Sequence, residues 1–205
     1  LESRGLRLAH VADFRRRGGQ GNYADTAPTP LDDDAYCDNW IGRNAQSLLG
    51  AAPKGQPWFL MINFTGPHSP MDITRSMERG LRARKFPEPN RSTEFDAATH
   101  LAIRQNYTAM VENIDRWLGV LLEQVRQRGE LDNTLVVYSS DHGEMLGDQN
   151  RWAKSLPFQV SIGVPLAIAG PGVERGIRSD ALVSHIDLAA TFLTAAGIAV
   201  PAQMD

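Results

Sequence analysis

Two polar clusters follow apolar runs in this sequence. Residues 66–70 read Gly-Pro-His-Ser-Pro and follow the run 58–64, and residues 139–144 read Ser-Ser-Asp-His-Gly-Glu and follow the run 134–138. In open α/β sheets, ligands bind in the crevice beyond the carboxyl ends of the strands. If both apolar runs are strands of one parallel sheet, the two clusters lie side by side at one crevice.

Asp141 and His142 offer an oxygen and a nitrogen ligand at the point where the chain leaves the second run. This pair suits a divalent metal ion, and Gly143 would permit an unusual backbone turn after it. The alternative is that Asp141 caps a following helix and His142 only forms local hydrogen bonds, because two adjacent ligands are a weak signal.

His68 and Lys154 are the other candidates for chemistry. His68 lies between two prolines, which would hold its imidazole in a stiff loop, and Lys154 supplies a positive charge for an anionic group. Each has an ordinary alternative, since an isolated His is commonly a surface residue and an isolated Lys is commonly solvated. We expect both to face the crevice that holds Asp141 and His142.

Composition limits the class of protein. Hydrophobic residues make up 42% of the 205 residues and charged residues 22%, which is typical of a globular domain. The net charge of -3 gives no reason to expect a nucleic acid or an anionic membrane as partner. No segment approaches the ~20 apolar residues that cross a bilayer. The single cysteine, Cys37, excludes an internal disulfide.

The elements that would position these residues alternate between strands and helices. Apolar runs predict buried strands in residues 58–64, 135–138 and 164–168. Helical spacing of apolar residues predicts helices in residues 35–49, 95–128 and 186–196. Residues 1–30 are rich in Arg, Gly and Pro, and predict an irregular segment.

This alternation predicts an α/β layered fold with a mainly parallel sheet flanked by helices. We expect residues 1–205 to form a single, partial domain. The sequence begins at Leu1 rather than Met and stops shortly after a predicted helix, so we interpret both ends as cuts in a longer chain.

Taken together, the motifs resemble the sulfatase family of the alkaline phosphatase superfamily. The resemblance covers about residue 35 to the end, in the order and spacing of the C-terminal part of the family's catalytic domain. The matching segments are residues 67–70, Tyr107, 111–115, 131–134, 139–148, Lys154, 164–166, 170–172 and 185–193.

The resemblance implies roles for the four candidates. Asp141 and His142 would complete a divalent metal site, usually of Ca²⁺, with Mn²⁺ or Zn²⁺ as alternatives. His68 would contact the sulfate group and help to protonate the leaving oxygen. Lys154 would bind a sulfate oxygen or the bridging oxygen. The substrate implied is a sulfated small molecule or glycan.

The family's nucleophile does not match any segment. It is a formylglycine made from the Cys or Ser of a Cys/Ser-x-Pro/Ala-x-Arg motif, whereas residues 37–41 lack the Pro/Ala and the Arg, and residues 3–7 have Gly in the Pro/Ala position. The family's first acidic metal ligands follow an apolar strand; residues 32–34, three aspartates, do not, and we interpret them as helix-terminus residues. We therefore expect formylglycine in the parent protein and not in this chain.

Smaller departures concern residues beside the candidate site. Gln149 and Asn150 stand where many relatives have His and Gly, Gly163 where Arg is common, and Ala190 where Pro is frequent. They leave substrate preference and full activity open.

We interpret the chain as a fragment of a sulfuric ester hydrolase that is inactive alone. One alternative is a phosphonate monoester or phosphodiester hydrolase of the same superfamily. Another is a non-catalytic, sulfatase-like binding domain. A sheet that lacks its N-terminal strands would also leave an apolar edge open to self-association.

Overall fold

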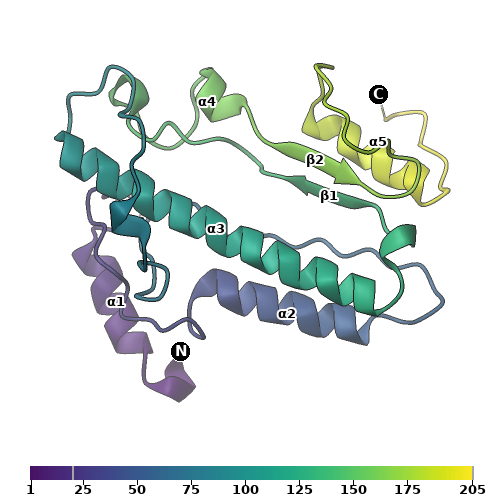
Figure 1. Ribbon diagram of the computed structural model, residues 1–205, viewed down its shortest axis with the longest axis horizontal. Helices are drawn as coiled ribbons and strands as arrows, with labels where there is room; N and C mark the ends of the chain where they lie inside the picture. Colours follow the sequence, from purple (N-terminus) through teal and green to yellow (C-terminus); the bar gives the residue numbers. More distant parts are fainter. Residues whose placement is uncertain (20, 205) are drawn as a thin grey trace. The chain divides into compact units, whose positions relative to one another are not determined.

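The computed structural model describes residues 1–19 and 21–204 (Figure 1). The chain forms two compact units. The first unit consists of Leu1–Gly129 and Met145–Ala153, and the second of Glu130–Glu144 and the residues from Lys154 onward. Among the described helices, none has the length and apolar composition of a bilayer-spanning segment.

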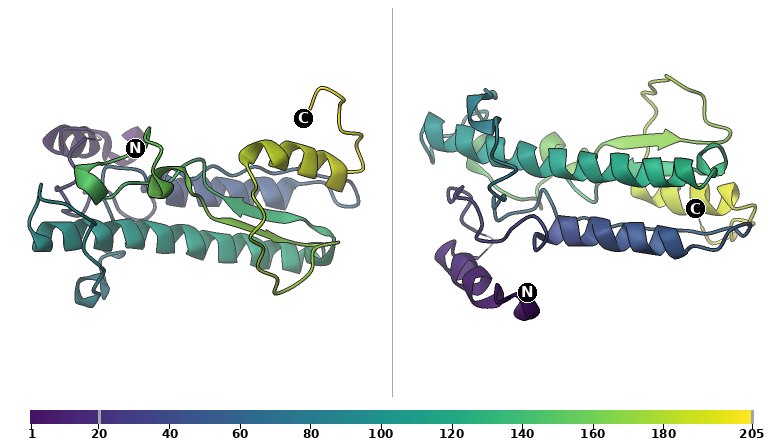
Figure 2. Two further views of the ribbon diagram at one scale, coloured as in Figure 1. Left: turned by 90° about the horizontal axis from the view of Figure 1, so that it is seen from above. Right: turned by 60° about the horizontal axis from the view of Figure 1, so that its bottom comes forward.

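Two long helices dominate the first unit. Helices α2 (Cys37–Ala51) and α3 (Ala97–Gln127) pack side by side, as the right-hand view of Figure 2 shows. They confirm the predicted helices 35–49 and 95–128. The Asn39 side-chain oxygen of α2 accepts hydrogen bonds from the Trp117 indole at 2.7 Å and from Arg116 at 2.9 Å, which joins α2 to α3.

The apolar stripe of α3 supplies much of the core. The Asp96 carboxylate caps its first turn by accepting from the Thr99 N–H at 2.8 Å. The stripe residues Ile103, Met110, Ile114, Trp117, Leu121 and Val125 are buried. The short helix η2 (Leu81–Ala83) packs against α3, and Leu81 joins the core.

The expectation of irregular structure in residues 1–30 is wrong for part of that segment. It contains η1 (Glu2–Arg4) and helix α1 (Arg7–Arg16). The cause is tertiary, because Arg17 is fully buried directly after α1. Its guanidinium donates to the Asp13 carboxylate at 2.8 Å and to the Asp25 and Ala27 carbonyls at 2.7 and 2.6 Å. These bonds hold the following loop against the helix.

The three aspartates at 32–34 precede α2 and do not lie in its first turn, which contains Asp38 instead. Asp32 accepts from the Ala35 N–H at 2.9 Å within a turn. Asp33 accepts from the hydroxyls of Thr74 and Ser76 at 2.5 and 2.6 Å. Their interpretation as helix-terminus residues is therefore wrong.

The prediction of a buried strand at residues 58–64 is also wrong. The segment belongs to no strand of the described structure, and Phe59 and Met61 are 70% and 67% exposed. An apolar run forms a buried strand only if neighbouring strands accept its backbone hydrogen bonds and helices cover its faces. Within residues 1–19 and 21–204, the first unit offers no strand to pair with it.

The second unit contains the two strands that the structure describes. Strand β1 (Val136–Ser139) pairs with β2 (Leu166–Ala169) in antiparallel register, with Val136 opposite Ala169 and Ser139 opposite Leu166. Both strands were predicted, but the expectation of a mainly parallel sheet is not met by this pair. A parallel pair needs a crossover of a dozen or more residues, usually helical. Between β1 and β2 the only α-helix is the four-residue α4 (Gln159–Ile162).

The second unit ends in helix α5 (His185–Ala195), which confirms the predicted helix 186–196. Ser184 and Asp187 form a capping box at its first turn, and the Asp187 carboxylate accepts from the Ser184 N–H at 2.7 Å. Gly197 follows with a φ of 69°, a conformation that ends helices at glycine. Short 3₁₀ turns lie at Leu131–Asn133 (η3) and Asp148–Asn150 (η4).

Candidate functional site

His68 lies in a tight turn of the first unit. The His68 N–H donates to the Thr65 carbonyl at 3.2 Å, and the ring Nδ1 lies 2.8 Å from the Ser69 carbonyl oxygen. A carbonyl oxygen can only accept, so Nδ1 carries the proton. The neutral imidazole therefore has its lone pair on Nε2, and the protonated imidazole can give up a proton from Nε2.

The Asp38 carboxylate holds this turn from the first turn of α2. Its Oδ1 accepts from the Thr65 N–H at 2.8 Å, and both of its oxygens lie 3.1 Å from the Gly66 nitrogen. Asp38 is only 1% exposed, and burial raises its pKa while the Gly66 and Thr65 bonds oppose that rise. Asp38 was not predicted from the sequence, because residues 32–34 were expected to be the carboxylates at this helix terminus.

Asp141 and His142 lie directly after β1 in the second unit. The Asp141 carboxylate accepts from the His142 N–H at 3.0 Å, and Nδ1 of His142 donates to the Gly143 carbonyl at 2.7 Å. This bond again fixes the neutral tautomer with its lone pair on Nε2. Nε2 of His142 lies 3.6 Å from Oδ2 of Asp141.

These two atoms fit one metal ion. Metal–ligand distances of about 2.0–2.6 Å for imidazole nitrogen and carboxylate oxygen allow adjacent ligand atoms to lie about 3–4 Å apart. A histidine that binds a metal through one ring nitrogen usually donates the N–H of the other nitrogen to a backbone carbonyl or a carboxylate, as His142 does to Gly143. The described residues contain no group of three or more His, Cys, Asp or Glu side chains placed to hold a metal. The pair by itself supplies two potential ligand atoms, fewer than a complete metal site needs.

Gly143 is required for a different reason from the one expected. Its φ is not positive, so it makes no unusual turn. Instead, a Cβ atom on Gly143 would lie 2.0 Å from the carbonyl oxygen of Val160 in α4. The Gly143 N–H donates to the Ser161 carbonyl at 2.8 Å, so the backbone after His142 lies against α4.

Lys154 is half-buried and belongs to the second unit, like Asp141 and His142. Its two neighbours, Ala153 and Ser155, have φ values of 61° and 80°. Positive φ is costly for residues with a Cβ, and such outliers cluster at functional sites. The structure therefore places a cation in a strained segment. His68 lies in the other unit, so a crevice shared by all four residues remains a prediction.

His185, for which the sequence predicted no role, also contacts the end of β1. Its Nε2 donates to the Ser140 carbonyl at 2.7 Å, so α5 is tied to the residue before Asp141. Ser139 and Ser140 secure the same segment, through bonds to the Pro165 carbonyl at 3.0 Å and the His142 carbonyl at 2.9 Å.

The departures at Gln149 and Asn150 have a structural account. Both residues have left-handed backbone conformations, with φ of 59° and 54°, which explains why Gly is suitable at the second position. Asn tolerates this conformation better than most residues. The Asn150 side-chain oxygen also accepts from the Thr93 N–H at 2.7 Å, and the Gln149 N–H donates to the Asn90 carbonyl at 2.8 Å.

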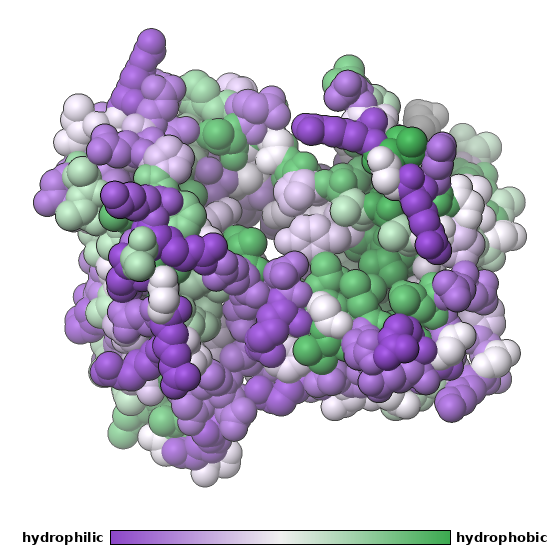
Figure 3. All heavy atoms as spheres, viewed as in Figure 1, coloured by the Kyte–Doolittle hydropathy of each residue, from purple (hydrophilic) through white to green (hydrophobic). Residues whose placement is uncertain are grey.

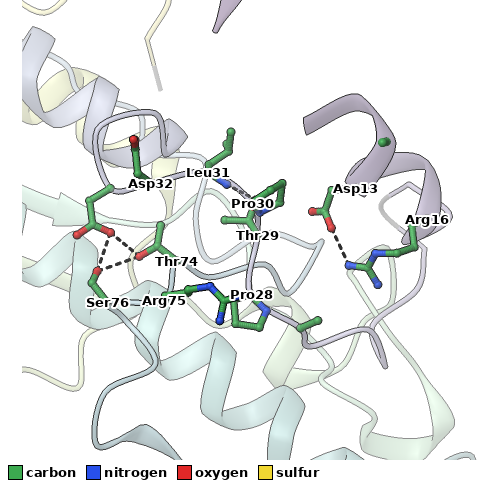
Figure 4. A pocket seen from close by; sticks show the side chains of 13 residues that line it. Asp13, Arg16, Pro28, Thr29, Pro30, Leu31, Asp32, Thr74, Arg75 and Ser76 are labelled. Atoms are coloured by element: carbon green, nitrogen blue, oxygen red, sulfur yellow. Dashed lines mark hydrogen bonds and ion pairs between the residues drawn. The ribbon is translucent and has the colours of Figure 1, made fainter. Parts of the chain in front are cut away.

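A separate pocket of about 790 Å³ lies in the first unit between α1 and the loops around Pro30 and Thr74 (Figure 4). Asp13 and Arg16 line one wall, and none of the four candidate residues lines it.

Large apolar side chains are exposed in both units, among them Phe59 and Leu182, and apolar surface is visible among the polar residues in Figure 3.

Comparison with known proteins defines the class. Residues 10–198 match the family described as Sulfatase. An arylsulfatase of Clostridium perfringens is 25% identical over 96% of this chain and 46% of its own length. A phosphonate monoester hydrolase from Silicibacter pomeroyi superposes with a TM-score of 0.80, at 22% identity, over 95% of this chain and 47% of that one. BT4656, solved in complex with its substrate D-glucosamine-2-N,6-O-disulfate, gives a TM-score of 0.75 at 21% identity, over 82% and 50%.

The neighbours share the fold of the sulfatase and alkaline phosphatase superfamily, a class of hydrolases. This chain belongs to the sulfatase family. It spans about half the length of the relatives it matches.

Proposed function

We propose that this chain supplies metal-binding and sulfate-binding groups to a sulfuric ester hydrolase. The proposal rests on the 3.6 Å distance between Oδ2 of Asp141 and Nε2 of His142. Nδ1 of His142 donates its proton to the Gly143 carbonyl, which leaves the lone pair of the neutral ring on Nε2. A divalent ion, Ca²⁺ in this proposal and Mn²⁺ or Zn²⁺ as alternatives, would supply positive charge to the transferring sulfuryl group.

His68 acts as the acid in this proposal. Its bond to the Ser69 carbonyl keeps the proton on Nδ1, so that in this proposal Nε2 is the atom that gives a proton to the leaving oxygen. Lys154 opposes the negative charge of a sulfate oxygen or of the bridging oxygen. Both groups bind and orient the ester, and neither is the nucleophile in this proposal.

The nucleophile of the proposal, formylglycine, belongs to the parent protein. Cys37 is exposed, and its Sγ lies 3.4 Å from the Thr65 hydroxyl, but its sequence context does not match the family motif. The substrate would be a sulfated small molecule or glycan, in keeping with the sulfated glucosamine bound by BT4656.

A phosphonate monoester hydrolase is the second candidate function. The observation that favours it is the 0.80 TM-score with the Silicibacter pomeroyi enzyme of that name. Both functions use a metal ion and cationic groups against an anionic, trigonal-bipyramidal transition state, so binding groups alone do not separate them.

Ligand binding tests the proposal. We would titrate the 205-residue chain, with Ca²⁺ present, with 4-nitrophenyl sulfate and with the phosphonate monoester 4-nitrophenyl phenylphosphonate, and follow amide chemical shifts. We expect sulfate-ester binding that weakens roughly tenfold in Lys154→Met, since one cation contact to an anion is lost. Lys85→Met, which removes an exposed lysine, is the control. Preference for the phosphonate supports the second function, and no binding of either ester contradicts both.

A further inference from the structure

The turn that carries His68 is held by a residue from a distant part of the sequence. Asp38 precedes Thr65 and Gly66 by 27 and 28 residues, yet its carboxylate accepts both of their backbone N–H groups. These residues begin the turn that the His68 N–H closes on the Thr65 carbonyl. A displacement of the first two residues therefore moves the imidazole directly.

The contact is too close to be incidental. A Cβ atom on Gly66 would lie 2.4 Å from Oδ2 of Asp38 and 3.5 Å from Cδ1 of Ile114 on α3. The backbone at Gly66 is thus confined between a carboxylate of α2 and the apolar face of α3. Two helices that pack on each other thereby define where the turn lies.

The Asp38 carboxylate binds this turn although its burial has a desolvation penalty. Burial disfavours the charged form of Asp38, and hydrogen bonds to backbone N–H groups are what offset that penalty. A residue whose only task was to favour the helix dipole could remain exposed at the helix start. Asp38 instead lies beneath the turn and is nearly inaccessible to solvent.

We propose that Asp38 is a positioning residue for His68, which fixes the direction of the imidazole through the Thr65 and Gly66 backbone. The proposal rests on the function proposed above for His68. It assigns no contact between Asp38 and substrate, so Asp38 acts on His68 geometry alone.

The experiment is nuclear magnetic resonance of the 205-residue chain, with ¹⁵N-labelled histidine and with His68→Gln to assign the ring signals. In the wild type we expect the neutral His68 ring to be the Nδ1–H tautomer. In Asp38→Ala we expect a mixture of both tautomers, and in Asp38→Asn an intermediate state, because an amide oxygen still accepts from the two N–H groups. Asp34→Asn removes an exposed carboxylate nearby and should leave the ring signals unchanged.

Inorganic sulfate serves as the second probe. We expect its affinity to fall roughly tenfold in Asp38→Ala, as displaced binding groups lose much of their effect. The signals of His142 should not move. An Asp38→Ala chain that remains folded with an unchanged His68 tautomer overturns the proposal. If that variant does not fold, unchanged His68 signals in Asp38→Asn overturn it. Sulfate binding that is unaffected by His68→Gln instead contradicts the proposed function of His68, whatever the tautomer result.

Discussion

The carbonyl oxygen of Val160 occupies the space that a Cβ atom on Gly143 would need. Such an atom would lie 2.0 Å from that oxygen and 3.1 Å from the carbonyl oxygen of Gly163. Both obstacles are backbone atoms, which cannot rotate away as a side chain can. The absence of a side chain at Gly143 therefore allows α4 to pack against the residue that follows His142.

Gly143→Ala should destabilise the second unit. Overpacking of this kind typically costs about 1–3 kcal/mol. To relieve this clash, the backbone at residue 143 would have to move away from α4. That movement would break the hydrogen bond from the residue 143 N–H to the Ser161 carbonyl and so displace His142. We expect a lower thermal midpoint by circular dichroism. Gly119→Ala is the control, because a Cβ there meets nothing within 4 Å and α3 would gain helix propensity. Equal midpoints for wild type and Gly143→Ala would contradict the close contact.

Metal binding by the isolated chain should be weak. Ca²⁺ takes 6–8 oxygen ligands, while Asp141 and His142 supply two ligand atoms, so water must fill the other positions. We expect calorimetry to give a Ca²⁺ dissociation constant weaker than about 1 mM, which is the weak end of the range of complete protein sites. Asp141→Ala should abolish this binding, and Asp132→Ala, an exposed residue of the same unit, should not. Tight binding that Asp141→Ala abolishes would mean that further ligands exist.

The chain alone should not turn over sulfate esters. Catalytic groups that act as a unit lose most of their joint effect when the nucleophile is missing, and no segment matches the nucleophile motif. We would assay 4-nitrophenyl sulfate hydrolysis with Ca²⁺ and repeat it with Cys37→Ala and Ser3→Ala. We expect no turnover above the uncatalysed rate in any of the three. Robust turnover that either substitution removes would identify a nucleophile within this chain.

Stability should depend on pH through Asp72. Burial raises the pKa of Asp72 to about 6, and the positive charge of Arg17 opposes the rise. Because the folded state holds this proton more tightly than the unfolded state, the Asp72 contribution to the free energy of unfolding is largest below about pH 4. It declines as the pH rises through about 6.

Asp72→Asn should therefore be more stable than the wild type at pH 7.5, by about 1–3 kcal/mol. The difference should vanish near pH 3.5, where both chains are neutral at this position. Urea unfolding at the two pH values measures it, and Asp34→Asn controls for loss of a surface charge. An Asp72→Asn chain that is less stable at both pH values would show that the carboxylate is needed for packing.

The sequence by itself determined the helices α2, α3 and α5, the places of the two strands β1 and β2, and the family. Periodic apolar residues located α3 within two residues, because this signal acts within one helix. The motifs around His68, Asp141, His142 and Lys154 identified the sulfatase family, since the types and order of residues persist in a linear pattern.

Only the tertiary structure decided how strands pair and which groups support the site. The run 58–64 has the same apolar character as β1, but strand formation depends on a partner that supplies backbone hydrogen bonds. The antiparallel direction of β2 likewise follows from a connection without a long crossover helix.

The same reason explains why Asp38 and Gly143 were missed or misread. Asp38 binds residues 27 and 28 positions away, and Gly143 is required by a carbonyl oxygen 17 positions away. The sequence does not show that residues so far apart along the chain lie close together in space. Burial of a carboxylate beneath a turn, and a close approach of two backbones, arise only when the helices have packed.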